Sequence, residues 1–170
     1  MALLDELFSF KEKLFELLCG DEKIVQLLLD EKDVKIPNRE LLFTTVFPYL
    51  YAPETVAQTQ TYLCFDIEAE EVPDNTYLDF DVFVWMFCHE SKIEVKDGGG
   101  TRPDQLAMQT QRVLSLSDDF GATQLRLESV TSVFPIKEHW GKMLQYKTIA
   151  FNTPNSARNQ LRGSTRRRIP

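Results

Sequence analysis

Two segments in the middle of the chain alternate between apolar and other residues, and they constrain the fold more than any other feature. In residues 62–70 and again in residues 77–88, every second residue is apolar. Strict alternation is typical of β-strands with one buried face, because successive side chains of a strand point to opposite faces. Pro73, Asp74 and Asn75 between the segments are turn-forming residues. The pattern therefore predicts a long β-hairpin.

The register of this hairpin follows from the turn. If Asp74 and Asn75 are the two turn residues, cross-strand partners have residue numbers that sum to 149. The predicted pairs are Ala69 with Phe80, Ile67 with Val82, Phe65 with Val84 and Leu63 with Met86. One face of the hairpin is then wholly apolar. A slip of one residue would invert that face, so this register is the expected one.

The other face of the hairpin divides into an aromatic part and an acidic part. The aromatic part consists of Tyr62, Phe83, Trp85 and Phe87. Aromatic side chains seldom stay in water in a patch of this size. We expect either the helices of this chain or a neighbouring subunit to cover them, and these four residues are a candidate interface.

The acidic part lies at the predicted tip, where Glu68 faces Asp81 and Glu70 faces Asp79. Like charges directly opposite each other destabilise a sheet. Three interpretations remain open: a solvated tip or subunit contact, the acidic wall of a ring lumen, and a site for a divalent cation. The residues are not spaced as a calcium-binding loop, and we expect no metal.

Helical patterns flank the hairpin. Residues 3–18 predict an amphipathic helix that ends at Gly20, Asp21 is expected to cap a second helix, and a short third helix starts at Asn38. Residues 47–57 read as an irregular connector. After a glycine-rich loop, Pro103 begins a helix to about Leu116. Strands follow at 124–134 and 142–151, with residues 139–141 as a turn.

These elements predict an α+β fold. An antiparallel or mixed sheet containing the long hairpin is expected to pack against two N-terminal helices and one central helix. Residues 1–155 would form a single domain, with the N-terminal helices in 3–31 and the sheet and central helix in 58–151. Residues 156–170 would form a basic, flexible C-terminal tail.

The composition limits where the protein works. The longest uninterrupted apolar run is Val82–Cys88, whereas a membrane helix needs about 20 residues, so we expect no membrane span. Asp5 and Glu6 interrupt the N-terminal apolar stretch, which does not resemble a signal peptide. Cys19, Cys64 and Cys88 include no CxxC pair, and we expect buried, inert thiols in a reducing compartment.

The charge of the chain is unevenly distributed. Five arginines and no acidic residue give the last fifteen residues a charge of +5, whereas the whole chain carries −7, so residues 1–155 carry −12. The arginines are Arg158, Arg162, Arg166, Arg167 and Arg168. An acidic body is unsuited to wrapping nucleic acid. The tail is either a segment that docks on an acidic partner protein or DNA, or a solvated, solubilising end.

No constellation of residues predicts catalysis. Pro73-Asp74 and Glu90-Ser91-Lys92 match the letters of the PD-(D/E)xK nuclease pattern. The two carboxylates would nevertheless lie roughly 50 Å apart along one straight strand, too far to share one Mg²⁺. His89 and His139 are expected to lie far apart, without a ligand set or a nucleophile–base pair. The triglycine loop lacks GK[ST]. We therefore expect neither an enzyme nor a cofactor.

Three parts of the chain are similar to tail-terminator and tail-completion (neck) proteins of long-tailed bacteriophages. Residues 77–89 resemble their long strand, residues 102–107 (Arg-Pro-Asp-Gln-Leu-Ala) resemble the R-x-D-x-L-A start of their helix, and residues 125–151 resemble their closing hairpin. The resemblance covers about residues 60–151. The two N-terminal helices and the arginine-rich tail depart from the compact members of the family.

The resemblance implies a structural virion protein, made in the host cytoplasm. It would form a homohexameric ring at the head-proximal end of the tail tube, where it ends tube growth and joins the tail to the head connector. Its partners would be further copies of itself, the tail-tube protein and the connector or stopper protein, with genome DNA passing through the lumen without specific binding. The alternatives are another neck, stopper, adaptor or baseplate ring subunit and, from a different class, a small intracellular adaptor domain.

Overall fold

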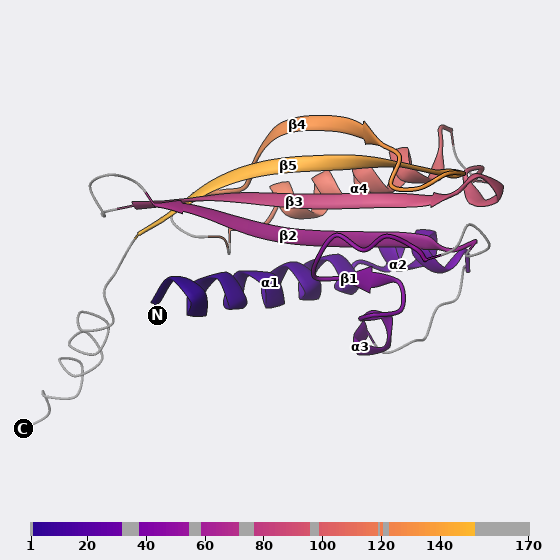
Figure 1. Ribbon diagram of the computed structural model, residues 1–170. Coiled ribbons are helices and arrows are strands. Elements are labelled where there is room, and N and C mark those ends of the chain that lie inside the picture. Colours follow the sequence, from indigo (N-terminus) through magenta and orange to yellow (C-terminus); the bar gives the residue numbers. More distant parts are fainter. Residues whose placement is uncertain are drawn as a thin grey trace, which may run out of the picture.

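The computed structural model describes residues 2–31, 38–54, 59–71, 77–95, 99–118, 120 and 123–151. The helices are α1 (Ala2–Gly20), α2 (Glu22–Leu29), α3 (Asn38–Leu41), the 3-10 helix η1 (Glu90–Lys92) and α4 (Arg102–Ser115). The strands are β1 (Val46–Phe47), β2 (Thr61–Glu71), β3 (Tyr77–His89), β4 (Arg126–Val133) and β5 (His139–Phe151). Figure 1 shows the long strands running side by side, with α1 along the sheet.

The strands form one mixed sheet in the order β1-β2-β3-β5-β4. β1 pairs with β2 in parallel, and the other neighbours are antiparallel. The predicted hairpin register is confirmed, because Ala69 pairs with Phe80 and Leu63 with Met86. The proposed turn residues Asp74 and Asn75 lie outside the described part of the chain. The mixed sheet and its accompanying helices confirm the predicted α+β fold.

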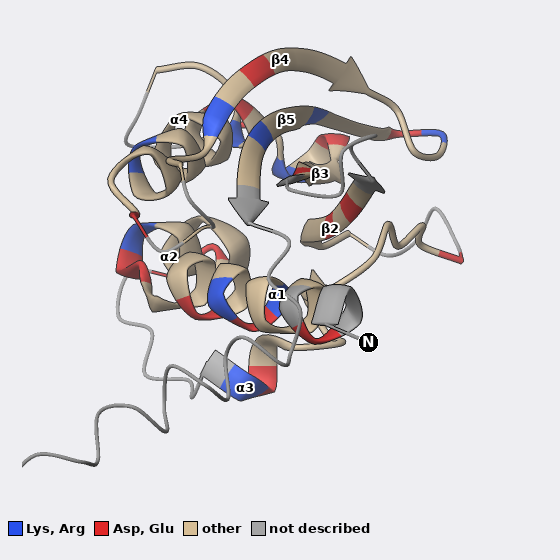
Figure 2. Ribbon diagram, turned by 90° about the vertical axis from the view of Figure 1, so that its left-hand side faces the viewer, with Lys and Arg blue, Asp and Glu red and all other residues tan. Residues whose placement is uncertain are grey.

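The helices α1, α2 and α4 gather on one side of the sheet, as Figure 2 shows. The apolar row predicted for the hairpin faces them, and its members Leu63, Phe65, Val82, Val84 and Met86 are all buried. Phe10 of α1 places its ring 5.1 Å from that of Phe80 and 5.8 Å from that of Phe120. These contacts bury one face of the sheet against the helices, and no described helix covers the centre of the opposite face.

Polar caps position the helices on the sheet. Asp21 accepts a hydrogen bond from the amide of Ile24 at 2.9 Å, which confirms it as the N-cap of α2. The same carboxylate accepts hydrogen bonds from the side chain of Gln109 on α4. Thr101 and Asp104 cap α4 reciprocally, which satisfies amide groups that the first turn leaves unpaired.

Two local predictions were wrong. Phe47, expected to begin an irregular connector over residues 47–57, lies instead with Val46 in the strand β1, which pairs in parallel with β2. Residues 139–141, expected to form a turn, open β5 and pair with residues 87–89 of β3. The turn lies earlier, where Glu138 adopts φ 64°. Gly141 pairs with Phe87, and glycine is needed at this strand position because a Cβ there would come within 2.3 Å of the Met86 carbonyl oxygen.

Candidate functional site: the open face of the sheet

We call the side of the sheet opposite the helices the open face. Because side chains alternate along each strand, the register assigns residues to it directly. It carries Tyr62, Cys64, Asp66 and Glu68 from β2, Asp79, Asp81, Phe83, Trp85, Phe87 and His89 from β3, and His139, Gly141, Met143, Gln145, Lys147 and Ile149 from β5. Among the described elements, no helix packs over the centre of this face (Figure 2).

The aromatic end of the open face is closed by the chain itself. Phe47 and Tyr51 stack with ring centroids 4.1 Å apart, and both lie against Tyr62. The ring centroid of Tyr62 in turn lies 5.3 Å from that of Phe87. Tyr62 and Phe87 are therefore 2% and 0% exposed. The cover comes from β1 and the residues after it, and not from a helix. Within the candidate interface, Phe83 and Trp85 are the residues that remain for contact with a partner.

Phe83 and Trp85 form a stacked pair at the centre of the open face. Their ring centroids are 5.7 Å apart with an interplanar angle of 18°, and both side chains are half-buried. In the register, Phe83 lies between Asp66 and Gln145, and Trp85 lies between Cys64 and Met143. The pair is therefore an apolar area with polar neighbours toward the hairpin tip, a composition typical of a docking surface.

The acidic end of the open face is only partly neutralised. The predicted facing pairs are present, since Glu68 pairs with Asp81 and Glu70 with Asp79. Asp81 accepts a hydrogen bond from Gln145 at 3.0 Å and lies 3.8 Å from the Lys147 Nζ. For Glu68 and Asp79, the described residues include no cation that forms an ion pair. The side chain of Glu70 lies outside the description.

Asp66 also has a cationic partner, because the Lys11 Nζ of α1 lies 2.6 Å from its Oδ1. The described residues contain no group of three or more His, Cys, Asp or Glu side chains placed to hold a metal ion. A role of these carboxylates in subunit contact or lumen lining stays a prediction.

The two histidines meet, contrary to the expectation from the sequence. His89 and His139 are paired between β3 and β5, with ring centroids 5.3 Å apart. The His89 Nε2 lies 3.4 Å from a Glu138 carboxylate oxygen, and its Nδ1 lies 2.9 Å from the Ser91 Oγ. The expectation was wrong because 50 residues of chain separate two positions that the sheet register brings together.

This Ser91–His89–Glu138 arrangement has the residue types of a nucleophile–base pair, but its geometry is that of a helix cap. The His89 Nδ1 also accepts a hydrogen bond from the Ser91 backbone amide at 3.2 Å, as N-cap of η1. The lone pair that a general base would use is therefore shared with the backbone. Of the nuclease-like letters, Glu90 and Lys92 lie in η1, and Asp74 lies outside the described residues.

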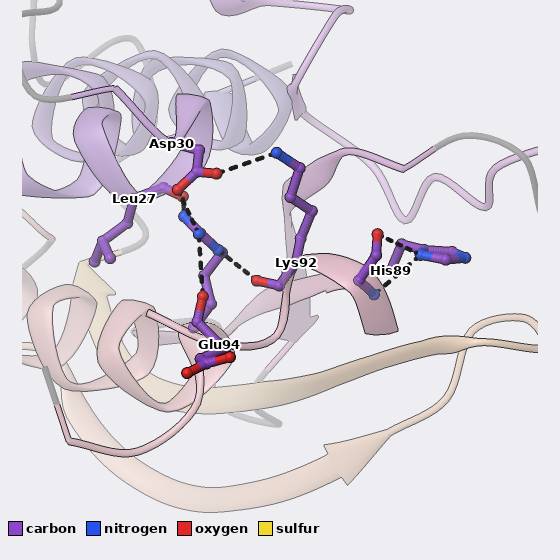
Figure 3. Close-up of polar contacts among 7 residues, drawn as sticks. Leu27, Asp30, His89, Lys92 and Glu94 are labelled. Atoms are coloured by element: carbon purple, nitrogen blue, oxygen red, sulfur yellow. Dashed lines mark hydrogen bonds and ion pairs between the residues drawn. The ribbon is translucent and has the colours of Figure 1, made fainter. Parts of the chain in front are cut away.

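A buried arginine was missed by the sequence reasoning. Arg102 is 3% exposed. It donates to the carbonyl oxygens of Leu27 and Lys92 at 2.7 Å each, to Asp30 at 2.6 Å and to Glu94 at 3.5 Å (Figure 3). The fork of the guanidinium thus joins α2, η1 and α4. Its hydrogen bonds hold these three elements together.

The cysteines are buried, as predicted. Burial raises the pKa of Cys19 to about 12 and that of Cys88 to about 11. Burial likewise raises the pKa of Cys64 to about 12. At neutral pH these thiols are protonated, and a protonated thiol is neither a nucleophile nor a metal ligand. The arginines of the tail, Arg158 to Arg168, lie outside the described residues.

The sequence was compared with family models, curated proteins and solved structures. The sequence model of the family YomW matches residues 13–148, which run from α1 into β5. The search of curated proteins and the search of solved structures gave no match. None of the described helices is long and apolar enough to cross a membrane.

Proposed function

We propose that this chain, which belongs to the YomW family of phage-derived Bacillus prophage proteins, is a structural subunit of a phage virion. In this proposal it forms a homohexameric ring at the head-proximal end of the tail tube. The ring ends tube polymerisation and joins the tail to the head connector. It assembles in the host cytoplasm and remains in the virion.

The observation that carries the proposal is the stacked pair of Phe83 and Trp85 on the open face. The helices cover one face of the sheet, and the segment after β1 covers only the aromatic end of the other. An apolar patch on an uncovered sheet face is stabilised when a neighbouring subunit covers it, because the patch is then removed from water. A contact between two different surfaces of identical subunits closes into a ring when the rotation permits it.

The acidic end supports the same assignment in a second way. Glu68 and Asp79 carry negative charge on the open face without a described cationic partner. If this end of the hairpin lines the lumen, phosphate groups of passing DNA are repelled and do not adhere. A wall of this charge favours passage of the genome without specific binding.

Related neck positions share these features. A stopper, adaptor or baseplate ring subunit would use the same surface with other partners, and the position of the gene between capsid and tail-tube genes would favour a neck role. A small intracellular adaptor domain would stay monomeric under all conditions. An enzyme would need a substrate-binding acid, base or nucleophile set. The Ser91–His89–Glu138 arrangement, the strongest such set in the described residues, serves as a cap.

The solution mass tests the proposal. The purified protein is measured by sedimentation velocity alone and after addition of the tail-tube protein. Closed rings, either free or only with the tube protein, support a terminator. A protein that remains monomeric in both conditions contradicts the ring and favours the adaptor domain.

A further inference from the structure

We infer that the arginine-rich tail, residues 156–170, folds back onto the open face of its own subunit and covers the Phe83–Trp85 pair. The occupant of this half-covered surface in the free subunit is thus a segment of the same chain. The inference goes beyond the proposed ring and does not depend on it, because it concerns the subunit before any assembly.

The point at which the chain leaves the sheet is the first argument. Phe151, the last residue of β5, pairs with Tyr77, and Ile149 pairs with Asp79. The tail therefore begins at the acidic end of the open face. Trp85 lies eight residues further along β3, which is roughly 26 Å in a strand. An extended chain advances about 3.3 Å per residue, so the tail reaches the aromatic pair within roughly ten residues.

Charge complementarity is the second argument. The tail carries five arginines and no acidic residue, whereas residues 1–155 carry −12. The Lys11 and Lys147 ammonium groups lie near Asp66 and Asp81. Glu68 and Asp79 have no such partner among the described residues. They are the carboxylates of the open face with the most capacity for a guanidinium.

The chemistry of arginine fits the rest of the surface as well. A guanidinium pairs with a carboxylate through two parallel hydrogen bonds and stacks on the flat face of an aromatic ring. The open face offers both partners, with carboxylates at Glu68 and Asp79 and rings at Phe83 and Trp85. A lysine ammonium can also approach a ring face, but it has neither the planar stacking surface nor the paired hydrogen bonds of a guanidinium. The tail has no lysine.

Attachment to the same chain decides between the subunit's own face and that of a neighbour. A short flexible connection gives an effective concentration on the order of millimolar. This exceeds the micromolar concentration of subunits in an ordinary solution. At such concentrations the tail therefore occupies its own subunit first, and a partner that binds the open face must displace it.

Trp85 provides the readout. The chain has two tryptophans, so Trp140→Phe leaves Trp85 as the single fluorophore. The full chain with this substitution is compared with a version ending at residue 155. A third version carries Gln at all five tail arginines and guards against a truncation that misfolds. Acrylamide quenching of Trp85 is measured at low salt and in 1 M NaCl.

The inference predicts quenching of Trp85 that is two-fold or more weaker in the full chain than in the other two versions at low salt. High salt should remove the difference, because ion pairs at a surface are screened. Glu68→Gln with Asp79→Asn should raise quenching toward that of the truncated chain. The matched control, Glu12→Gln with Glu16→Gln, removes the same charge from exposed positions of α1 and should leave the protection intact.

Equal quenching of all versions at low salt would overturn the inference. Protection that grows with protein concentration, together with a rise in mass, would show that the tail binds a neighbouring copy and would overturn it too. Neither result bears on whether rings form with the tube protein, which the mass measurement tests separately.

Discussion

The Nη2 of Arg102 lies 2.6 Å from the Oδ1 of Asp30, and this ion pair bonds the first residue of α4 to the C-cap of α2. The same guanidinium donates to the carbonyl oxygens of Leu27 and Lys92. These carbonyls lie at the end of α2 and in η1, where no further helical turn supplies an amide donor. One side chain thus connects segments separated by more than 70 residues.

Replacement of Arg102 by Met should destabilise the fold strongly. The substitution leaves buried carbonyl oxygens without donors, and we expect a loss of about 3 kcal/mol in the free energy of unfolding. Chemical denaturation measures it. The control is Arg126→Gln, which removes an exposed arginine that is also 2.6 Å from a carboxylate, that of Glu128. It should cost less than about 0.5 kcal/mol. Similar losses in both variants would contradict the architectural role of Arg102.

Gly141→Ala should also destabilise the protein. The new Cβ would lie 2.3 Å from the Met86 carbonyl oxygen and 2.9 Å from the Phe87 Cα, and these backbone atoms belong to the central strand. We expect a loss of about 2–3 kcal/mol, measured by thermal or chemical denaturation. Gly20→Ala is the matched control, because nothing lies within 4 Å of the added methyl group. A neutral effect at Gly141 would mean that β3 and β5 are further apart than described.

Asp104→Asn should weaken the protein in a pH-dependent way. The hydrogen bond from the Thr101 hydroxyl, at 2.7 Å, lowers the pKa of Asp104 against the opposing effect of burial. Because the folded-state pKa is below the unfolded value, the carboxylate stabilises the fold above about pH 4. This contribution disappears as the pH falls through the folded-state pKa. Because the Asp104 side chain is 47% exposed and solvent screens its charge, we expect a loss of only about 0.5 kcal/mol at pH 7 that shrinks toward pH 3.

Denaturation midpoints of the wild type and Asp104→Asn between pH 3 and pH 7 measure this dependence. A difference that stays constant over the range would show that the ionised carboxylate is not the stabilising form.

Phe83→Gln should weaken assembly more than folding. The side chain is half-buried beside Trp85, so its loss should cost the subunit only about 1 kcal/mol, whereas the proposed contact between subunits loses an aromatic anchor. We expect at least a ten-fold weaker association by sedimentation. Leu116→Gln removes another large apolar side chain, 79% exposed at the end of α4, and should assemble normally. Equal assembly of both variants would remove Phe83 from the interface.

Much of the fold could be predicted because its strongest signals are local. The alternation in residues 62–70 and 77–88 determined the register of β2 and β3, and Asp21 marked the start of α2 from its residue type alone. These predictions need only neighbours in the chain or across one turn, and short-range geometry depends directly on sequence.

The missed features depend on contacts between distant segments. The pairing of His89 with His139 and the four hydrogen bonds of Arg102 arise only after the sheet has formed. β1 has two residues, too few for a pattern to appear. For the same reason, the structure leaves Phe83 and Trp85 of the four candidate interface residues available to a partner, whereas the chain itself buries Tyr62 and Phe87. The sequence marks Tyr62 and Phe87 as aromatic, but it does not show that Phe47, Tyr51 and His139 lie against them.

We propose that this protein closes the growing end of a tail tube, and electron microscopy of tubes shows whether it does. Tail-tube protein is polymerised with and without the protein, and tube lengths and ends are recorded. We expect shorter tubes, each with a ring at one end, and no such cap when Phe83→Gln is used. Tubes of unchanged length with bare ends, in the presence of excess folded protein, would contradict it.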